Sequence, residues 1–293
     1  LLSNFCSFKA LVFTDSRQYN GSEEFLSTHI DVVPKIDGKA IIPAGAHAFP
    51  FEFVLPEDIP SSYKYESKKI SDDDFHKCEV TYTISFKATK SRKLKLSEVF
   101  NEEIVVYGDL KPTTETGTAI YQLERELFKP QSDKNNVIKL RVEIANSFLR
   151  PGENVKLKLD VTNDSGRLIN AVKFVLRRRL TLISGEGKKR TFDKDIRHCS
   201  GKSKEIAAKK KTITWHTIPT LAELYSIQYS KCVSLEFILK VTVCLSMPHI
   251  TPNLEIPIVI GQGAYDTLKE IVDIDNLDIE ESPPSYDKSC FYV

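Results

Sequence analysis

The sequence contains no long hydrophobic run, and none of its apolar stretches reaches the roughly 18 residues that a membrane-spanning helix needs. Its six cysteines include no CxxC pair, which argues against a zinc ribbon or a thioredoxin-type redox centre. We expect a reducing compartment, because scattered thiols such as Cys244, which lies in an apolar strand pattern, are usually buried and free. With 41 Lys and Arg against 40 Asp and Glu, the net charge of +1 indicates neither a nucleic-acid nor a membrane partner.

Motifs of the common enzyme classes are also missing. The sequence has no GxSxG, HExxH or P-loop motif, and its six histidines form no HxH or HxxxH pair. Gly261-Gln262-Gly263 lacks the third glycine of a dinucleotide-binding loop, because Asp266 occupies that position. We therefore predict that the chain is not an enzyme and uses no cofactor or metal.

What the sequence does contain is a repeated alternation of apolar and polar residues. This period of two predicts antiparallel strands that pack on one face, and the near absence of helical periodicity predicts an all-β fold of β-sandwiches. Turn signals such as Asp37-Gly38 and Pro151-Gly152 separate the strands. The alternating segments run over 80–86, 138–144, 155–161, 233–245 and 254–260.

The length of 293 residues predicts two domains with an additional tail. The alternation breaks over 113–136, where we place the linker, although Ile120, Leu123 and Leu127 are spaced for a short helix. We therefore expect an N-terminal domain over 1–112 and a C-terminal domain over 137–262. An acidic tail follows over 263–293, and we expect it to be mobile.

Charge is unevenly distributed along the chain. Between Arg177 and Lys211, 13 Lys or Arg stand against 4 Asp or Glu, whereas Asp266 to Asp287 holds 8 acids and 1 Lys. The basic region is interpreted either as a solvated hairpin and loop or as a patch for anionic lipid, acidic cargo or the chain's own tail. The candidate patch residues are Arg177, Arg179, Lys188, Lys189, Arg190, Lys209, Lys210 and Lys211.

Arg178 needs a separate explanation, because alternation places it on the apolar face with Leu176 and Leu180. A charge on that face is costly unless it is paired. We favour a sandwich edge or a β-bulge at this point over an internal carboxylate partner.

The tail contains the sequence Pro283-Pro284-Ser285-Tyr286, which is a PPxY motif. Prolines hold the peptide near the polyproline II conformation, so little entropy is lost when it docks in the aromatic groove of a WW domain. Pro283, Pro284 and Tyr286 are the predicted contact residues. A second segment of the tail, with Ile271, Val272, Ile274 and Asp275, is similar to a clathrin-binding box, although an acidic linker explains it better.

Three segments resemble the arrestin family. Ile42 to Pro56, IPAGAHAFPFEFVLP, is similar to the arrestin N-domain motif "lpaGeHsfpFsFqLP", and His47 within it is interpreted as structural. Leu149 to Glu153, followed by Val155 to Val161 and then Thr162 to Ser165, resembles the opening of the arrestin C-domain. Leu254 to Gly261 looks like the closing strand of that domain.

Together with the PPxY motif, the resemblance points to the α-arrestin branch, the arrestin-domain-containing proteins. It implies two β-sandwich domains joined by a hinge, with a tail that recruits HECT-type ubiquitin ligases through their WW domains. The expected cargo is the cytoplasmic part of a membrane receptor or transporter. The expected location is the cytoplasm, with recruitment to the plasma membrane and endosomes for endocytosis and protein sorting.

Two departures from the family accompany this resemblance. The first N-domain strands are expected to be missing before Leu1, and one PPxY motif stands where many α-arrestins carry two. A single motif predicts a weaker contact with a ligase that has several WW domains. The alternative function is that of a phosphoreceptor-binding regulator like β-arrestin, or a retromer-like trafficking scaffold.

Overall fold

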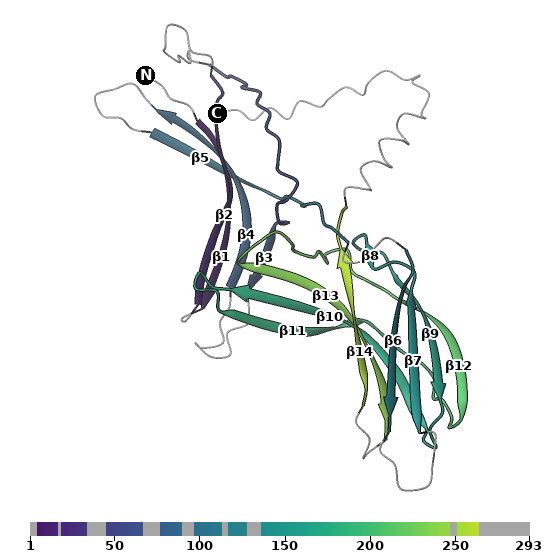
Figure 1. Cartoon of the computed structure of the whole chain (residues 1–293). Coiled ribbons are helices and arrows are strands. Elements are labelled where there is room, and N and C mark those ends of the chain that lie inside the picture. Colours follow the sequence, from purple (N-terminus) through teal and green to yellow (C-terminus); the bar gives the residue numbers. More distant parts are fainter. Residues whose placement is uncertain are drawn as a thin grey trace, which may run out of the picture. The chain divides into compact units, whose positions relative to one another are not determined.

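The computed structural model describes residues 5–16, 19–33, 45–66, 77–89, 97–112, 117–127, 136–246 and 251–263. These residues divide into two compact units, one ending at Gly108 and the other running from Asp109 to Gly263 (Figure 1). Each unit is built from β-strands arranged in antiparallel sheets, with one short parallel pairing. The predicted all-β class is therefore confirmed.

The first unit contains a five-stranded sheet with the order β2-β1-β4-β3, and β5 also pairs with β4. Its strands are β1 (Phe5–Ser16), β2 (Tyr19–Asp31), β3 (Tyr63–Glu66), β4 (Lys77–Thr89) and β5 (Ser97–Ile104). The alternation predicted over 80–86 lies in β4, where Cys78, Val80 and Tyr82 are buried. The buried Tyr82 hydroxyl donates a hydrogen bond to the Pro60 carbonyl, and burial raises its pKa.

The described part of the arrestin-like segment Ile42 to Pro56, which begins at residue 45, lies outside the strands. Residues 46–56 of this segment form no ladder, and Phe51 and Val54 are exposed. The His47 ring is also exposed and stacks on Phe49 with 6.0 Å between ring centroids. The alternation of Phe49, Phe51 and Phe53 therefore does not correspond to a strand over residues 46–56.

The second unit has two sheets (Figure 1). One has the order β11-β10-β13-β14-β8 and the other the order β12-β9-β7-β6. The strands are β6 (Ala119–Glu126), β7 (Val137–Ile144), β8 (Phe148–Leu149), β9 (Val155–Asn163), β10 (Ile169–Ile183), β11 (Lys189–Lys202), β12 (Lys210–Ile218), β13 (Val233–Leu245) and β14 (Asn253–Ile260).

The core of the second unit lies between these two sheets. Alternate residues of β7 and β9 point inward, as the sequence pattern predicts, and so do those of β10 and β13. Direct contact between the sheets is visible where Phe174 of β10 meets His216 of β12, with 4.7 Å between ring centroids. Among the largest fully buried side chains here are Leu140, Leu157, Leu159, Leu176, Leu180 and Phe237.

The burial of one cysteine differs from the prediction. Cys244 is only half-buried, because it lies on the opposite face of β13 from the buried Val241 and Val243. Cys199 and Cys232 are buried and, like Cys244, are not part of a disulfide. The predicted burial of Cys244 is wrong, since the apolar run around it belongs to the residues on either side.

The predicted linker over 113–136 contains a strand instead of a helix. Residues 119–126 form β6, which pairs antiparallel with β7 from Ala119 opposite Ile144 to Glu126 opposite Val137. Ile120 is half exposed and Leu123 lies on the other face, so their helical spacing does not correspond to a helix.

The part of the arrestin-like motif that ends β9 contains Asn163, whose side chain holds the following turn by hydrogen bonds. Its amide Nδ2 donates to the carbonyls of Arg167 at 2.8 Å and Ala207 at 3.0 Å, and its Oδ1 accepts the Ser165 hydroxyl at 2.5 Å. Asn163 and Ser165 are fully buried. This amide therefore ties the β9–β10 turn to the segment that leads into β12.

Candidate functional site

Two of the predicted sites cannot be placed on the fold. The WW-binding residues Pro283, Pro284 and Tyr286 lie outside the described residues. The same holds for the clathrin-like residues Ile271, Val272, Ile274 and Asp275. The structure therefore bears on the third candidate, the basic patch of the second unit.

The two arginines of the patch belong to an ion-pair cluster on the outer face of β10. Arg177 Nε lies 2.7 Å from Asp195 Oδ1, and Arg179 makes a bidentate pair with Asp193, with both N–O distances at 2.9 Å. Glu255 of β14 lies 3.4 Å from Arg179 and 3.8 Å from Arg177. Strand pairing of β10 with β11 brings these groups together, because Arg177 lies opposite Asp195 and Arg179 opposite Asp193.

The electrostatics of this cluster favour the charged forms. The hydrogen bond that Arg177 donates to Asp195 raises the pKa of Arg177, and the bonds that Arg179 donates to Asp193 raise the pKa of Arg179. Conversely, the Arg179 hydrogen bond lowers the pKa of Asp193. Three carboxylates thus surround two guanidinium groups, and Arg177 and Arg179 have little positive charge left for a lipid or cargo anion.

Arg178 shares a strand face with Leu176 and Leu180 but is only half-buried. Its strand, β10, lies inside the sheet between β11 and β13, so it is not an edge strand. The pairing of β10 with β11 is irregular between Val175 and Arg177, whereas the pairing with β13 continues in register past Arg178. An irregularity of the predicted kind is therefore present beside Arg178, on the β11 side.

The six remaining basic residues form two groups at opposite ends of β10. Lys189 pairs with Ile183 at the end of β10, whereas Lys210 pairs with Asn163, just before β10 begins. β10 has 15 residues, so at roughly 3.3 Å per residue its ends lie about 45 Å apart. The predicted single patch is therefore divided into the arginine cluster and two separate lysine groups.

Most of these lysines have local contacts. Lys188 Nζ lies 2.9 Å from Glu186, and Arg190 lies over the Phe192 ring. Lys209 Nζ donates to the Asp164 carbonyl at 2.6 Å, and Lys211 Nζ lies 3.2 Å from Asp160. The exposed Lys189 and Lys210 have no ion-pair partner within the described part of the chain.

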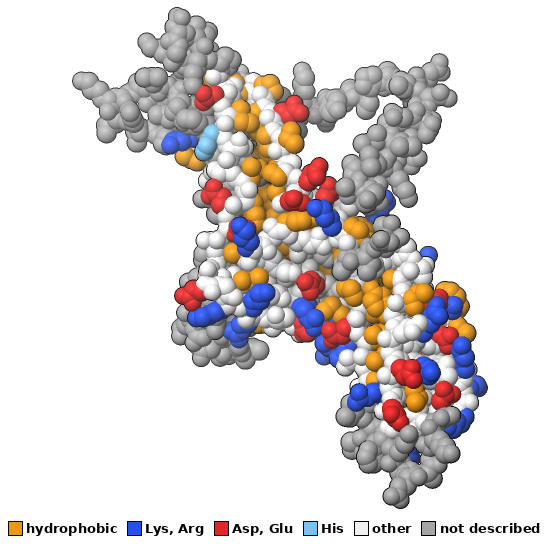
Figure 2. All heavy atoms as spheres, in the orientation of Figure 1, with side chains coloured by type: hydrophobic (Ala, Val, Ile, Leu, Met, Phe, Trp, Pro, Cys, Tyr) orange, Lys and Arg blue, Asp and Glu red, His pale blue; other side chains and the backbone are white. Residues whose placement is uncertain are grey.

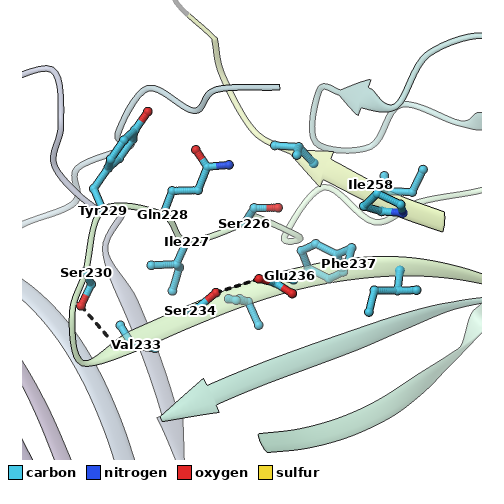
Figure 3. Close-up of a pocket in the computed structure, with 14 residues that line it drawn as sticks. Ser226, Ile227, Gln228, Tyr229, Ser230, Val233, Ser234, Glu236, Phe237 and Ile258 are labelled. Carbon is cyan, nitrogen blue, oxygen red and sulfur yellow. Dashed lines mark hydrogen bonds between the residues drawn. The ribbon is translucent and has the colours of Figure 1, made fainter. Parts of the chain in front are cut away.

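A pocket that the sequence did not indicate lies where residues 226–230 cross the start of β13 and the end of β14 (Figure 3). Its volume is about 290 Å³. Ser226 is fixed to β14 by hydrogen bonds to both the nitrogen and oxygen of Ile260, at 3.0 and 2.7 Å. Ser234 donates to Glu236 at 3.3 Å. The hydroxyls of Ser226 and Ser234 are thus engaged with the protein, and no histidine or lysine is among the described residues that line this pocket.

The sequence also did not indicate the exposed apolar residues on the outer face of the β12-β9-β7-β6 sheet. This face exposes Trp215 and Ile213 on β12, with Lys158 lying over the Trp215 ring at 5.4 Å. Lys and Arg side chains are interspersed with Asp and Glu over this part of the molecule (Figure 2). The alternation of β12 was the available signal, but its bulky apolar residues lie on the exposed face.

Neither a metal centre nor a membrane span is found in the described part of the chain. No group of three or more His, Cys, Asp or Glu side chains is placed to hold a metal ion among those residues. No helix within the same residues is long and apolar enough to cross a bilayer.

Comparison with protein families gives a consistent result for both units. Residues 3–111 match the model of the arrestin (or S-antigen) N-terminal domain, and residues 134–264 match that of the arrestin C-terminal domain. No curated protein matches the chain significantly in sequence. Arrestin-family proteins are non-enzymatic adaptors that bind receptor cytoplasmic regions and act in trafficking. With both domains present in order and covering most of its length, the chain belongs to the arrestin family.

Proposed function

We propose that this chain is an adaptor of the α-arrestin type, which links membrane-protein cargo to WW-domain HECT-type ubiquitin ligases. The observation that carries the proposal is the PPxY motif at Pro283 to Tyr286, which follows the matched arrestin C-terminal domain. The arrestin domains would bind the cytoplasmic part of a receptor or transporter. Ubiquitination of that cargo would then direct its endocytosis and sorting.

The chemistry of the motif supports this assignment. Pro283 and Pro284 favour the polyproline II conformation before binding, and Tyr286 supplies an aromatic anchor two residues further on. Eight acidic residues against one lysine between Asp266 and Asp287 favour an extended, solvated peptide, which a WW domain requires.

In this proposal the chain supplies proximity, and the ligase supplies the catalysis. Binding cargo and ligase at once makes the encounter between them effectively intramolecular, which raises the local concentration of the ligase. In this arrangement the chain itself needs no catalytic group. We place the adaptor in the cytoplasm, with recruitment to the plasma membrane and endosomes.

Proximity labelling in cells tests the proposal. The intact chain is compared with Tyr286→Ala and with Tyr292→Ala, a tail tyrosine outside the motif. We expect WW-domain ligases to disappear from the labelled proteins with Tyr286→Ala alone, whereas labelled membrane cargo is retained. Equal labelling of the ligases by all three proteins would contradict the proposal.

A second candidate is a regulator that binds phosphorylated receptors, as β-arrestins do, or a retromer-like scaffold. The exposed lysines from Lys209 to Lys211 favour it, because they are placed at the accessible start of β12. Binding to a receptor tail that is lost when the tail is dephosphorylated would support this candidate. Binding of the receptor tail that survives its dephosphorylation would exclude this candidate.

A further inference from the structure

β12 is an exposed edge strand in the described part of the second unit. It runs from Lys210 to Ile218, pairs with β9 in an unbroken register, and terminates the sheet order β12-β9-β7-β6. An edge strand presents unpaired backbone N–H and C=O groups and is usually protected by proline, a bulge or charge. Between Thr212 and Ile218 this strand has no proline, no bulge and no Lys, Arg, Asp or Glu.

Two large apolar side chains stand beside this open edge. Ile213 is 50% exposed and Trp215, the single tryptophan of the chain, is 74% exposed. Both lie on the outer face of the sheet, because the alternate residues Thr212, Thr214 and His216 are turned toward the other sheet. Exposed aromatic and β-branched residues of this kind stabilise a strand when they meet similar residues across a strand pair.

We propose that a second copy of the chain pairs along β12, antiparallel and centred on Thr214, so that the two sheets become one continuous sheet. In this register Ile213 lies directly opposite the partner's Trp215, and Trp215 lies opposite the partner's Ile213. Four apolar side chains then form one cluster on the outer face. Because odd-numbered residues lie opposite odd-numbered residues in this register, the outer faces of the two copies lie on the same side of the joined sheet.

The charges near β12 agree with antiparallel pairing of two copies. Lys210 lies opposite the partner's Ile218 and Lys211 opposite the partner's Thr217, so the two basic ends are separated. Parallel pairing would place Lys209 to Lys211 of both copies side by side, where like charges repel. On the inner face, His216 lies opposite the partner's Thr212. Burial lowers the pKa of His216 and favours its neutral form, so this pair adds no charge to the interface.

Local ion pairs favour a second copy over an acidic peptide as the occupant. Lys211 is already 3.2 Å from Asp160, and Lys158, beside Trp215, is 3.1 Å from Glu143. Lys209 is bonded to the Asp164 carbonyl at 2.6 Å. An acidic peptide on this edge would have to compete with these contacts, whereas the symmetric pairing leaves them in place.

The first test measures the mass of the full chain in solution by sedimentation over a dilution series. The variant is Ile213→Lys, and its matched control is Ile120→Lys, because Ile120 is equally exposed on the opposite edge strand β6. We expect a dimer for the unmodified chain and for Ile120→Lys, and a monomer for Ile213→Lys. A monomeric unmodified chain, or equal dimerisation of the two variants, would overturn the proposal.

A second test examines the register and does not depend on weakening the pair. Directly opposite residues have Cα atoms about 4.5–5.5 Å apart, within the range that a disulfide spans. Thr214→Cys should therefore form a covalent dimer on mild oxidation of the full chain. Thr217→Cys should not form this covalent dimer, because the residue opposite it is the partner's Lys211. The unmodified chain serves as the control for crosslinking through native thiols. Equal crosslinking of the two variants would rule out this register.

Discussion

Asn163 fixes a turn through its side-chain amide, which bonds to backbone on both sides of the turn. Replacing it with aspartate exchanges a donor for a carboxylate oxygen that faces the carbonyls of Arg167, Ile206 and Ala207. Because residue 163 is fully buried, an unpaired charge there costs about 3–5 kcal/mol of unfolding free energy.

The prediction for Asn163 compares an isosteric substitution with one that removes the carboxamide. Asn163→Asp should lower the unfolding free energy by about 3–5 kcal/mol, and Asn163→Ala by about 2–3 kcal/mol, since alanine leaves carbonyls without donors but adds no charge. Chemical denaturation followed by circular dichroism measures both. An aspartate variant as stable as the natural chain would show that the amide does not hold the turn.

Asp193 provides a prediction about pH. The Arg179 hydrogen bond lowers the pKa of Asp193 from its usual value, so its contribution to stability is present above the unfolded pKa and is lost as pH falls through the folded pKa. Asp193→Asn should therefore lower the unfolding free energy at pH 7 by about 1 kcal/mol, a value reduced by partial exposure. The difference from the natural chain should shrink as the pH falls below about 4.

Glu186→Gln is the control for this experiment. Glu186 also pairs with a cation, Lys188, but its side chain is 76% exposed, so solvent screens the pair. We expect no measurable change in stability at either pH. A constant difference for Asp193→Asn from pH 7 to pH 3 would mean that the carboxylate charge is not what stabilises the cluster.

Among the strands, β10 and β11 pack so closely at Gly201 that this position has no room for a side chain. A Cβ on Gly201 would lie 2.3 Å from Cε2 of Phe174, its direct partner across the strands. The Phe174 ring is buried against His216, so it has little room to move. Gly201 thus allows an aromatic ring to cover the neighbouring strand.

Gly201→Ala should consequently lower the unfolding free energy by about 1–3 kcal/mol through overpacking. Lys202→Ala, at the next and exposed position of β11, should leave it nearly unchanged. Thermal denaturation of both variants measures the difference. If Gly201→Ala unfolds at the same temperature as Lys202→Ala, then Phe174 adjusts and the packing is looser than its distances indicate.

The strands that sequence reasoning located are those with one buried and one solvated face. β7, β9, β13 and β14 were found because their alternating apolar residues fill the core. β12 was missed because Ile213 and Trp215 lie on the exposed face, and β6 because its inward residues are few. Residues 46–56 show the converse, since they alternate but pair with no strand in the described part of the chain.

The candidate site was predictable to a different degree. The sequence grouped Arg177, Arg179 and the lysines by their proximity along the chain. It could not indicate that Asp193, Asp195 and Glu255 surround the arginines, because strand pairing and not sequence distance brings these groups together. Nor did it separate the lysine groups, which lie at opposite ends of β10.

For the whole molecule, the central proposal assigns two tasks to two parts of the chain. The arrestin domains match over 3–111 and 134–264, and the PPxY motif follows them in the sequence. Cargo binding is assigned to the domains and ligase binding to the motif. The two activities should therefore be separable by substitutions in the tail that leave the domains unchanged.

The most direct measurement is calorimetric titration of an isolated WW domain from a HECT-type ligase into the purified full chain. We predict saturable binding with one WW domain per chain, which Tyr286→Ala abolishes and Tyr292→Ala leaves unchanged, because only Tyr286 anchors the motif. Unchanged affinity for Tyr286→Ala, or no binding by the natural chain, would contradict the assignment of this protein as a ligase adaptor.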